Sequence, residues 1–196
     1  MDIILASASP RRAQLLKQIQ LDFTVAASDI DETQIINESA VDYVQRMASQ
    51  KALVGQANSP SNCVIIGADT VVCLSQRVLS KPQDEAEACA SLMALSGRIH
   101  SVYTALNVLY QGRSLQAMSA TEVVFRQINE AEARAYWASG EPLDKAGGYA
   151  IQGLGAGFVS SIQGSYSGVV GLPLYELMQL LAELDIQPLS HIQQLS

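Results

Sequence analysis

The sequence predicts an α/β protein with mixed strands rather than a regular doubly wound parallel sheet. Two β-rich runs, residues 99–110 and 114–125, flank a Gln-Gly-Arg turn at 111–113 and must pair antiparallel as a long hairpin. Residues 63–74 are apolar at nearly every position, which is typical of a central strand buried on both faces. Around these strands, helical patterns alternate with shorter apolar runs.

The N-terminal region is expected to contain two short strands and two helices. Residues 3–6 form an apolar run, and a Ser/Pro turn follows it directly. Pro10 suits the first turn of a helix that runs to about residue 19, because its fixed backbone angle and missing N–H are tolerated there. The remaining elements expected in this region are a strand at 23–26, a polar loop at 28–38 and a longer helix at 39–57.

After the central strand, the patterns indicate three further helices and a Gly-rich segment. Helices are expected at 84–95 and 130–139, on either side of the hairpin. Residues 140–171 are rich in glycine and are predicted to alternate loops with short strands. Pro173 opens a last helix with apolar residues at helical spacing, and the tail from Pro188 is expected to be loosely held.

Size and composition indicate one packed domain, residues 1–196, or two lobes that share a cleft. The chain has 196 residues, of which 48% are hydrophobic. A net charge of -7 disfavours nucleic acid as a partner, since affinity for the phosphate backbone depends on clustered Lys and Arg. The first residues have no basic segment, and no apolar run is long enough to span a membrane, so we expect a cytoplasmic protein without membrane association. The three cysteines lack the paired spacing of a zinc site and are expected to be buried thiols.

The start of the first predicted helix indicates an anion site. Ser9 is a natural N-cap, and Arg11 and Arg12 fall in the first turn, where the helix already carries partial positive charge. Each arginine there should cost a few tenths to about 1 kcal/mol unless an anion is bound. A phosphate would reverse that effect, with the hydroxyls of Ser7 and Ser9 converging on it. The alternative is an ordinary capped helix on the surface, with solvated arginines.

Asp69 is the second candidate, because a carboxylate in an apolar strand needs a compensating interaction. Burying an isolated charge costs several kcal/mol, so the group must face a cation, accept hydrogen bonds or be protonated. Gly67 and Ala68 precede it and would leave room for a ligand. Alternatively, Asp69 lies at a strand bulge or turn and bonds to nearby backbone.

Four further side chains could take part in such a site. Glu32, in the polar loop, could join Asp69 in holding Mg²⁺, which usually takes one or two protein carboxylates; an acidic loop pair is otherwise a solvated surface feature. Lys51 lies on the inward face of its predicted helix and Lys81 at an element boundary, and both could reach phosphate or extend into solvent. Gln152 can donate and accept hydrogen bonds at once, as reading a pyrimidine edge requires, although its segment could also be a flexible hairpin.

In this order, these motifs resemble the Maf family of nucleoside triphosphate pyrophosphatases from Leu5 to about Leu181. The motifs that carry the resemblance are Leu5-Ala6-Ser7-Ala8-Ser9-Pro10-Arg11-Arg12, Asp31-Glu32-Thr33, Gln50-Lys51-Ala52, Gly67-Ala68-Asp69-Thr70, Lys81-Pro82, residues 141–153 and Val170-Gly171-Leu172-Pro173. The resemblance implies an elongated, twisted mixed sheet with two lobes around a nucleotide cleft, and a homodimer. It also implies cleavage between the α and β phosphates with Mg²⁺ or Mn²⁺. Asp69 is then the catalytic carboxylate, either as proton acceptor for water or as a metal ligand.

Within the family, the residues at three places resemble those of the branch that hydrolyses dTTP and UTP: Ser9-Pro10-Arg11-Arg12, Thr70 and Ile151-Gln152-Gly153. Enzymes of this branch would remove nucleotides before polymerases use them. By resemblance, Arg11, Thr70 and Gln152 are the residues that select the substrate. The sister branch, which acts on 7-methyl-GTP, differs at these places. The alternatives are 7-methyl-GTP hydrolysis and a nucleotide-binding regulator of septum formation, a role historically attached to the family.

Overall fold

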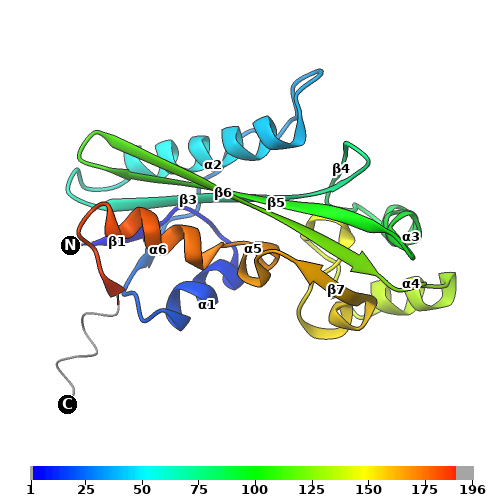
Figure 1. Cartoon of the computed structure of the whole chain (residues 1–196). Coiled ribbons are helices and arrows are strands. Elements are labelled where there is room, and N and C mark those ends of the chain that lie inside the picture. The colour runs from blue at the N-terminus through cyan, green and yellow to red at the C-terminus, as the bar shows by residue number, and fades with distance from the viewer. Residues whose placement is uncertain (1, 189–196) are drawn as a thin grey trace, which may run out of the picture.

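The computed structural model describes residues 2–188 and contains a seven-stranded mixed sheet with helices on both faces (Figure 1). The strand order is β2-β1-β3-β5-β6-β7, and β4 pairs with β3 beside this path. The strands are β1 (Ile3–Leu5), β2 (Thr24–Val25), β3 (Val64–Leu74), β4 (Arg77–Leu79), β5 (Ile99–Tyr110), β6 (Arg113–Phe125) and β7 (Val159–Gln163). β1 pairs parallel with β2 and β3, whereas all other pairs are antiparallel. The predicted mixed α/β fold is therefore confirmed.

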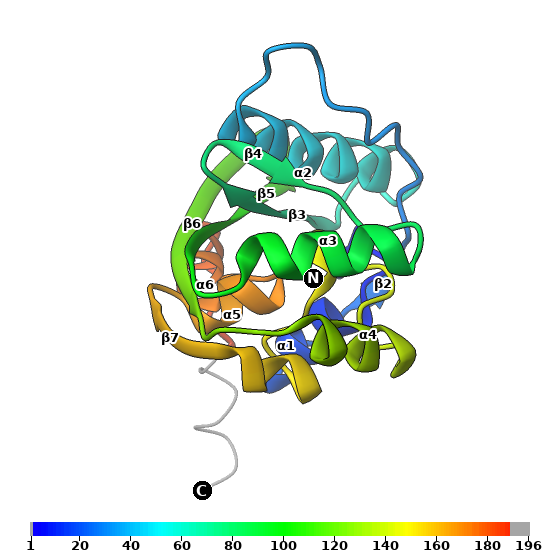
Figure 2. The same cartoon turned by 90° about the vertical axis from the view of Figure 1, so that its right-hand side faces the viewer.

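Helix α2 covers one face of the sheet, and α1, α5 and α6 lie against the other (Figure 1). The helices are α1 (Pro10–Gln18), α2 (Ala40–Ala57), α3 (Glu85–Leu95), α4 (Glu130–Ala138), α5 (Tyr166–Val170) and α6 (Leu174–Ala182), with two short 3₁₀ turns, η1 (Ala146–Gly148) and η2 (Gly153–Phe158). Figure 2 shows α3 and α4 together at the end of the sheet away from α6. The loop at 28–38 projects beyond α2 in the same view.

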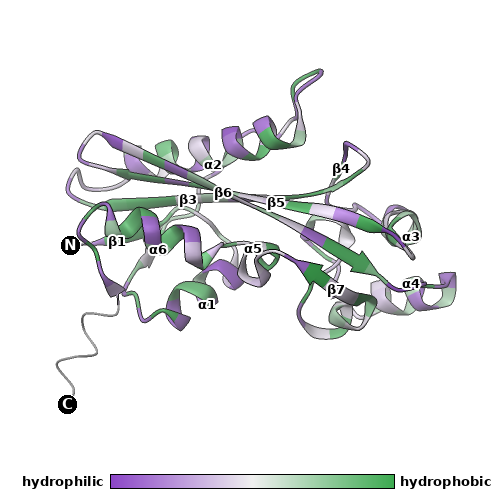
Figure 3. Cartoon of the chain, in the orientation of Figure 1, coloured by the Kyte–Doolittle hydropathy of each residue, from purple (hydrophilic) through white to green (hydrophobic). Residues whose placement is uncertain are grey.

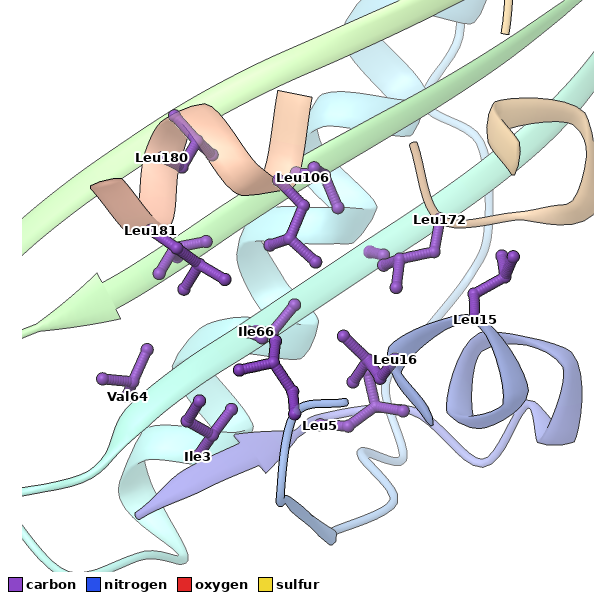
Figure 4. Packing of buried hydrophobic residues seen from close by; sticks show 14 of the residues in the cluster. Ile3, Leu5, Leu15, Leu16, Val64, Ile66, Leu106, Leu172, Leu180 and Leu181 are labelled. Carbon is purple, nitrogen blue, oxygen red and sulfur yellow. The ribbon is translucent and has the colours of Figure 1, made fainter. Parts of the chain in front are cut away.

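The two largest of the four apolar clusters in the described part of the chain lie at opposite ends of the sheet. In the first, Leu5 and Ile66 of the sheet pack against Leu16 of α1 and Leu181 of α6 (Figure 4). The second core packs β5 and β6 against α3 and α4, and Phe125 is its largest fully buried side chain. Figure 3 shows the corresponding pattern, with mixed hydrophilic and hydrophobic residues on the helices and a mainly hydrophobic β3. The apolar run that predicted a central strand thus corresponds to β3.

Three local elements differ from the sequence prediction. β4 was not predicted, because its turn with β3 uses Ser75 and Gln76 at positive φ, without the Gly or Asn that marks such turns. The Gly-rich segment contains one strand, β7, but also the two 3₁₀ turns and α5, where short strands and loops were predicted. β2 has two residues where four were predicted. The expectation for the tail concerns residues outside the described range, apart from Pro188 itself.

Candidate active site

A pocket lies where α1, α2 and β3 meet the Gly-rich segment. The space between its walls is about 750 Å³, with the open solvent at its mouth included. It brings together residues from distant parts of the chain, from Ser9 to Gly171. Eight of the predicted site residues line it: Ser9, Arg11, Arg12, Lys51, Asp69, Thr70, Lys81 and Gln152.

Asp69 and Lys51 form a buried ion pair at the base of this pocket. Each residue is 8% exposed, and Lys51 Nζ donates to Asp69 Oδ1 at 2.6 Å. β3 continues without a bulge at Asp69, which pairs with Ala105 of β5. The alternatives of a bulge at Asp69 and of a Lys51 side chain in solvent are therefore wrong.

Glu32 extends this pair into a chain of alternating charges. Its Oε1 lies 2.7 Å from Lys51 Nζ, and its Oε2 accepts from Lys81 Nζ at 3.0 Å. Burial alone would raise the pKa of Glu32, but the hydrogen bonds and charges of Lys51 and Lys81 outweigh it and lower the pKa to about 2. The acidic loop is thus tied to the pocket through Glu32 and is not merely a solvated surface feature.

Gly67 sets the distance between α2 and β3, and this corrects our expectation that it leaves room for a ligand. A Cβ at Gly67 would lie 2.4 Å from the backbone oxygen of Ala48 and 2.6 Å from the backbone nitrogen of Ala52. The space beside Gly67 is therefore filled by α2. Because these two residues flank Lys51 on the helix, the close approach brings the ammonium group to Asp69.

The two arginines of the N-terminal turn have different surroundings. Arg12 is 8% exposed, and its guanidinium donates to the carbonyl of Gly171 at 2.8 Å, to Ser7 Oγ at 3.0 Å and to Thr70 Oγ1 at 3.2 Å. Three of its five N–H groups are thus engaged by the protein. The side chain lines the pocket but ties α1 to β3 and to the turn before α6, so it is not the solvated arginine of the alternative reading.

The serines of this turn also differ from each other. Ser7 is buried, its hydroxyl accepts from Arg12 and from the backbone N–H of Ser9, and it does not line the pocket. Ser9 has the extended backbone of an N-cap, but its side chain makes no capping hydrogen bond. Ser9 and the partly exposed Arg11 therefore face the pocket, whereas Ser7 lies behind Arg12.

The three residues predicted to select the substrate all line the pocket, but they differ in how many protein partners their side chains have. Thr70 Oγ1 accepts from Arg12 and is 3.0 Å from Thr104 Oγ1, so it is part of a fixed network. The side-chain amide of Gln152 has no hydrogen-bond partner within residues 2–188. Arg11 likewise has no ion pair within this range. Two of the three therefore have donors available for a ligand.

Sequence reasoning missed several residues around the pocket, all associated with the Gly-rich segment. Tyr149 lines the pocket, and its hydroxyl is 2.8 Å from Nε2 of His100, a residue for which the sequence showed no partner. Burial lowers the pKa of His100 to about 4, so its ring is neutral near pH 7. Asp144 and Lys145 also line the pocket. The available signal was the density of side chains able to form hydrogen bonds between the glycines.

The donor set near Asp69 is compatible with one divalent cation. Within residues 2–188 there is no cluster of three or more His, Cys, Asp or Glu residues that could enclose a metal ion. Asp69 and Glu32, however, both contact the Lys51 ammonium, so the two carboxylates already flank one positive charge. Two carboxylates completed by water and phosphate oxygens are a set that Mg²⁺ accepts.

The fold and the pocket together define an α/β enzyme whose cleft suits a phosphorylated small molecule. The chain belongs to the Maf family, because residues 2–184 match the family model of Maf-like proteins. A relative from Alcanivorax borkumensis is 52% identical over 95% of this chain and 97% of its own length, and it is named dTTP/UTP pyrophosphatase. Another from Saccharophagus degradans, with the same name, is 48% identical over 94% of this chain and 90% of its own length.

Among solved structures, the Ham1 protein of Staphylococcus aureus matches 64% of this chain and 72% of its own, with 13% identity and a TM-score of 0.45. A dITP/XTP pyrophosphatase from Mycobacterium abscessus matches 65% of this chain and 76% of its own, with 16% identity and a TM-score of 0.42.

Within the described residues, no helix is both long and apolar enough to cross a membrane.

Proposed function

We propose that this protein is a nucleoside triphosphate pyrophosphatase that hydrolyses dTTP and UTP to the nucleoside monophosphate and pyrophosphate. One observation carries the proposal: a single pocket joins a cluster of cations to the buried carboxylate of Asp69 and to the unpaired amide of Gln152. The names of the relatives at about half identity support the choice of substrate. The same activity would remove unwanted or modified nucleotides before polymerases use them.

The triphosphate is held by the cationic side of the pocket. Arg11 and Ser9 lie at the N-terminus of α1, where free backbone N–H groups and the helix dipole favour an anion. Lys81 also lines the pocket, and within residues 2–188 its half-exposed ammonium is bound only to Glu32, so it can exchange that partner for phosphate. Arg12 and Ser7 were also predicted to bind phosphate. Their engaged hydrogen bonds favour a role in holding the turn, with the two remaining Arg12 N–H groups left for the ligand.

Asp69 accepts the proton of the attacking water. The oxygen of that water bonds to the α-phosphorus, the bond from this phosphorus to the bridging oxygen breaks, and pyrophosphate leaves with the electron pair. The Lys51 ammonium lies 2.6 Å from Asp69 and compensates the buried charge of the carboxylate that acts as the base. Lys51 and Lys81 also place positive charge near the phosphates, where negative charge develops.

A divalent metal, Mg²⁺ or Mn²⁺, belongs to this proposal, with Asp69 and Glu32 as its protein ligands. When bound, it would neutralise phosphate charge and polarise the phosphoryl group. Glu32 is suited to this role because its low pKa keeps it ionised under all physiological conditions.

The base is read by Gln152, with Arg11 and Thr70 as further determinants. Uracil and thymine present an N3–H donor beside carbonyl acceptors, and one amide can pair with both. Thr70 is held by Arg12 and Thr104, so it presents a fixed surface to the ligand. A site built on such a hydrogen-bonding pair rejects analogues that leave it unpaired.

The test is a product analysis with purified protein and Mg²⁺ in water enriched in ¹⁸O. We expect pyrophosphate from dTTP and UTP, with the label in the monophosphate. Orthophosphate as the first product, or label in pyrophosphate, contradicts cleavage at the α-phosphorus. A higher kcat/KM for 7-methyl-GTP than for dTTP and UTP in the same assay would make 7-methyl-GTP the assigned substrate.

A cytoplasmic homodimer is also part of the proposal. Light scattering during gel filtration tests whether the protein is a dimer.

A further inference from the structure

Glu141, just after α4, binds the backbone that follows Gln152. Its Oε2 accepts from the N–H of Leu154 at 2.8 Å, and its Oε1 accepts from the N–H of Gly155 at 2.9 Å. Both N–H groups lie at the start of η2. Gln152 is the N-cap residue of η2, yet its side chain makes no capping hydrogen bond. The carboxylate of Glu141 therefore supplies the cap and leaves the Gln152 amide unused.

The hydroxyl of Tyr136 connects this carboxylate to the other side of Gln152. It donates to Glu141 Oε1 at 2.9 Å and accepts from the N–H of Ala150 at 3.1 Å. Tyr136, a residue of α4, is buried in the second core with its ring against Phe158, so its position is fixed by packing. The segment Ile151-Gln152-Gly153 is thus held at both ends by one carboxylate and one hydroxyl.

Two glycines fit the chain around these groups. Gly153 has φ +65, and a Cβ there would lie 2.5 Å from Glu141 Oε2. A Cβ at Gly155 would lie 2.5 Å from the Tyr136 hydroxyl oxygen and 2.3 Å from the carbonyl oxygen of Ala150. The chain can approach Glu141 and Tyr136 this closely only with glycine at both positions. The segment is therefore held by close packing at two glycines as well as by hydrogen bonds.

We propose that Glu141 is a positioning residue for nucleotide selection, which holds the 150–155 segment so that the Gln152 amide meets the base in one orientation. This rests on the proposed function, in which Gln152 reads the base. Glu141 itself does not line the pocket and has no contact with the ligand in this proposal. Its effect on selection therefore depends entirely on Gln152, and that dependence can be measured.

The test is a double-mutant cycle of Glu141→Gln and Gln152→Ala, followed by kcat/KM for dTTP. The glutamine keeps the length of the side chain but turns an N–H₂ group toward a backbone N–H. We expect Glu141→Gln to lower kcat/KM by about tenfold, mainly through KM, and to have almost no further effect in the Gln152→Ala background. Losses that multiply in the double variant overturn the proposal. Glu130→Ala, which removes an exposed carboxylate from α4, is the control and should match the wild type.

Amide hydrogen exchange provides a second measurement that does not depend on activity. In Glu141→Gln, the amides of Ala150, Leu154 and Gly155 should exchange on the order of tenfold faster, while those of β3 stay unchanged. Unchanged exchange in the 150–155 segment overturns the positioning role. If the wild type releases no pyrophosphate from dTTP or UTP, the proposed function fails on that result, and the exchange data alone then decide whether Glu141 holds the segment.

Discussion

Lys51 of α2 donates from Nζ to Oδ1 of Asp69 in β3 at 2.6 Å, and both residues are 8% exposed. The ammonium also contacts Glu32, so it balances two carboxylates at once. A buried pair of this kind is compensated only while both partners remain, because one buried charge without its partner is strongly unfavourable. Catalysis and stability therefore depend on the same contact, and suitable substitutions can separate them.

Asp69→Asn should lower kcat by about 10²- to 10⁴-fold while the protein stays folded, since the amide cannot accept a proton from water. The substitution keeps the size of the side chain and leaves Lys51 with Glu32 as its partner. Steady-state pyrophosphate release measures the effect, and thermal unfolding checks the fold. Asp22→Asn, at an exposed position outside the pocket, is the control. A variant that retains a tenth of the wild-type kcat contradicts the role of Asp69.

Lys51→Met should lower the free energy of unfolding by about 3–5 kcal/mol, because it leaves Asp69 buried without its cation. Methionine keeps an unbranched apolar stem and is a good helix former, so α2 itself should be little affected. Adding Asp69→Asn to this variant should restore part of the lost stability. Urea unfolding of both single variants and the double variant gives the coupling, and simple additivity argues against a buried pair.

Gly67→Ala should destabilise the protein by about 1–3 kcal/mol or more, as in other overpacked sites, because the new methyl group meets the backbone of α2. The backbone oxygen of Ala48 would be 2.4 Å away, and backbone yields less readily than a side chain. Since the helix must move outward, Lys51 should also move away from Asp69 and kcat should fall. Gly157→Ala is the matched control, because nothing lies within 4 Å of a Cβ there. Equal stability of the two variants would show that α2 adapts freely.

The regular elements and the identity of the site could largely be predicted from the sequence, whereas its internal contacts could not. Apolar runs are local features, so β3 and the hairpin were predicted nearly at their observed bounds. Which of two adjacent arginines turns inward depends on Gly171, 159 positions from Arg12. The role of Glu141 depends on N–H groups 13 and 14 positions away, across a segment without periodicity. The lack of a side chain at Gly67 is visible in the sequence, but only the position of α2 shows what fills the space beside it.

Arg12→Ala should mainly lower stability, whereas Arg11→Ala should mainly weaken substrate binding. Arg12 donates to three protein groups, so its loss leaves buried acceptors unpaired and should lower the free energy of unfolding by about 1–3 kcal/mol. Arg11 has no such partners within residues 2–188, so its loss should leave stability nearly unchanged and raise KM for dTTP and UTP. Denaturant unfolding and steady-state kinetics on both variants provide the comparison. A large loss of stability in Arg11→Ala would contradict this division of roles.

His100 should make stability depend on pH between about 4 and 6.5. Its side chain is buried against Phe125 and Tyr149, and burial lowers its pKa from the ordinary 6.5 to about 4. In that window the unfolded chain binds the proton and the folded chain does not, so the free energy of unfolding falls as pH is lowered, by about 3 kcal/mol in total. His100→Gln keeps a partner for the Tyr149 hydroxyl but cannot titrate. The wild type and His100→Gln share the same carboxylates, so the difference between their urea unfolding curves at pH 7, 6 and 5 isolates the effect of His100. We expect the wild type to lose more stability than the variant over this range. Parallel loss in the two proteins would mean that His100 is readily protonated in the folded state.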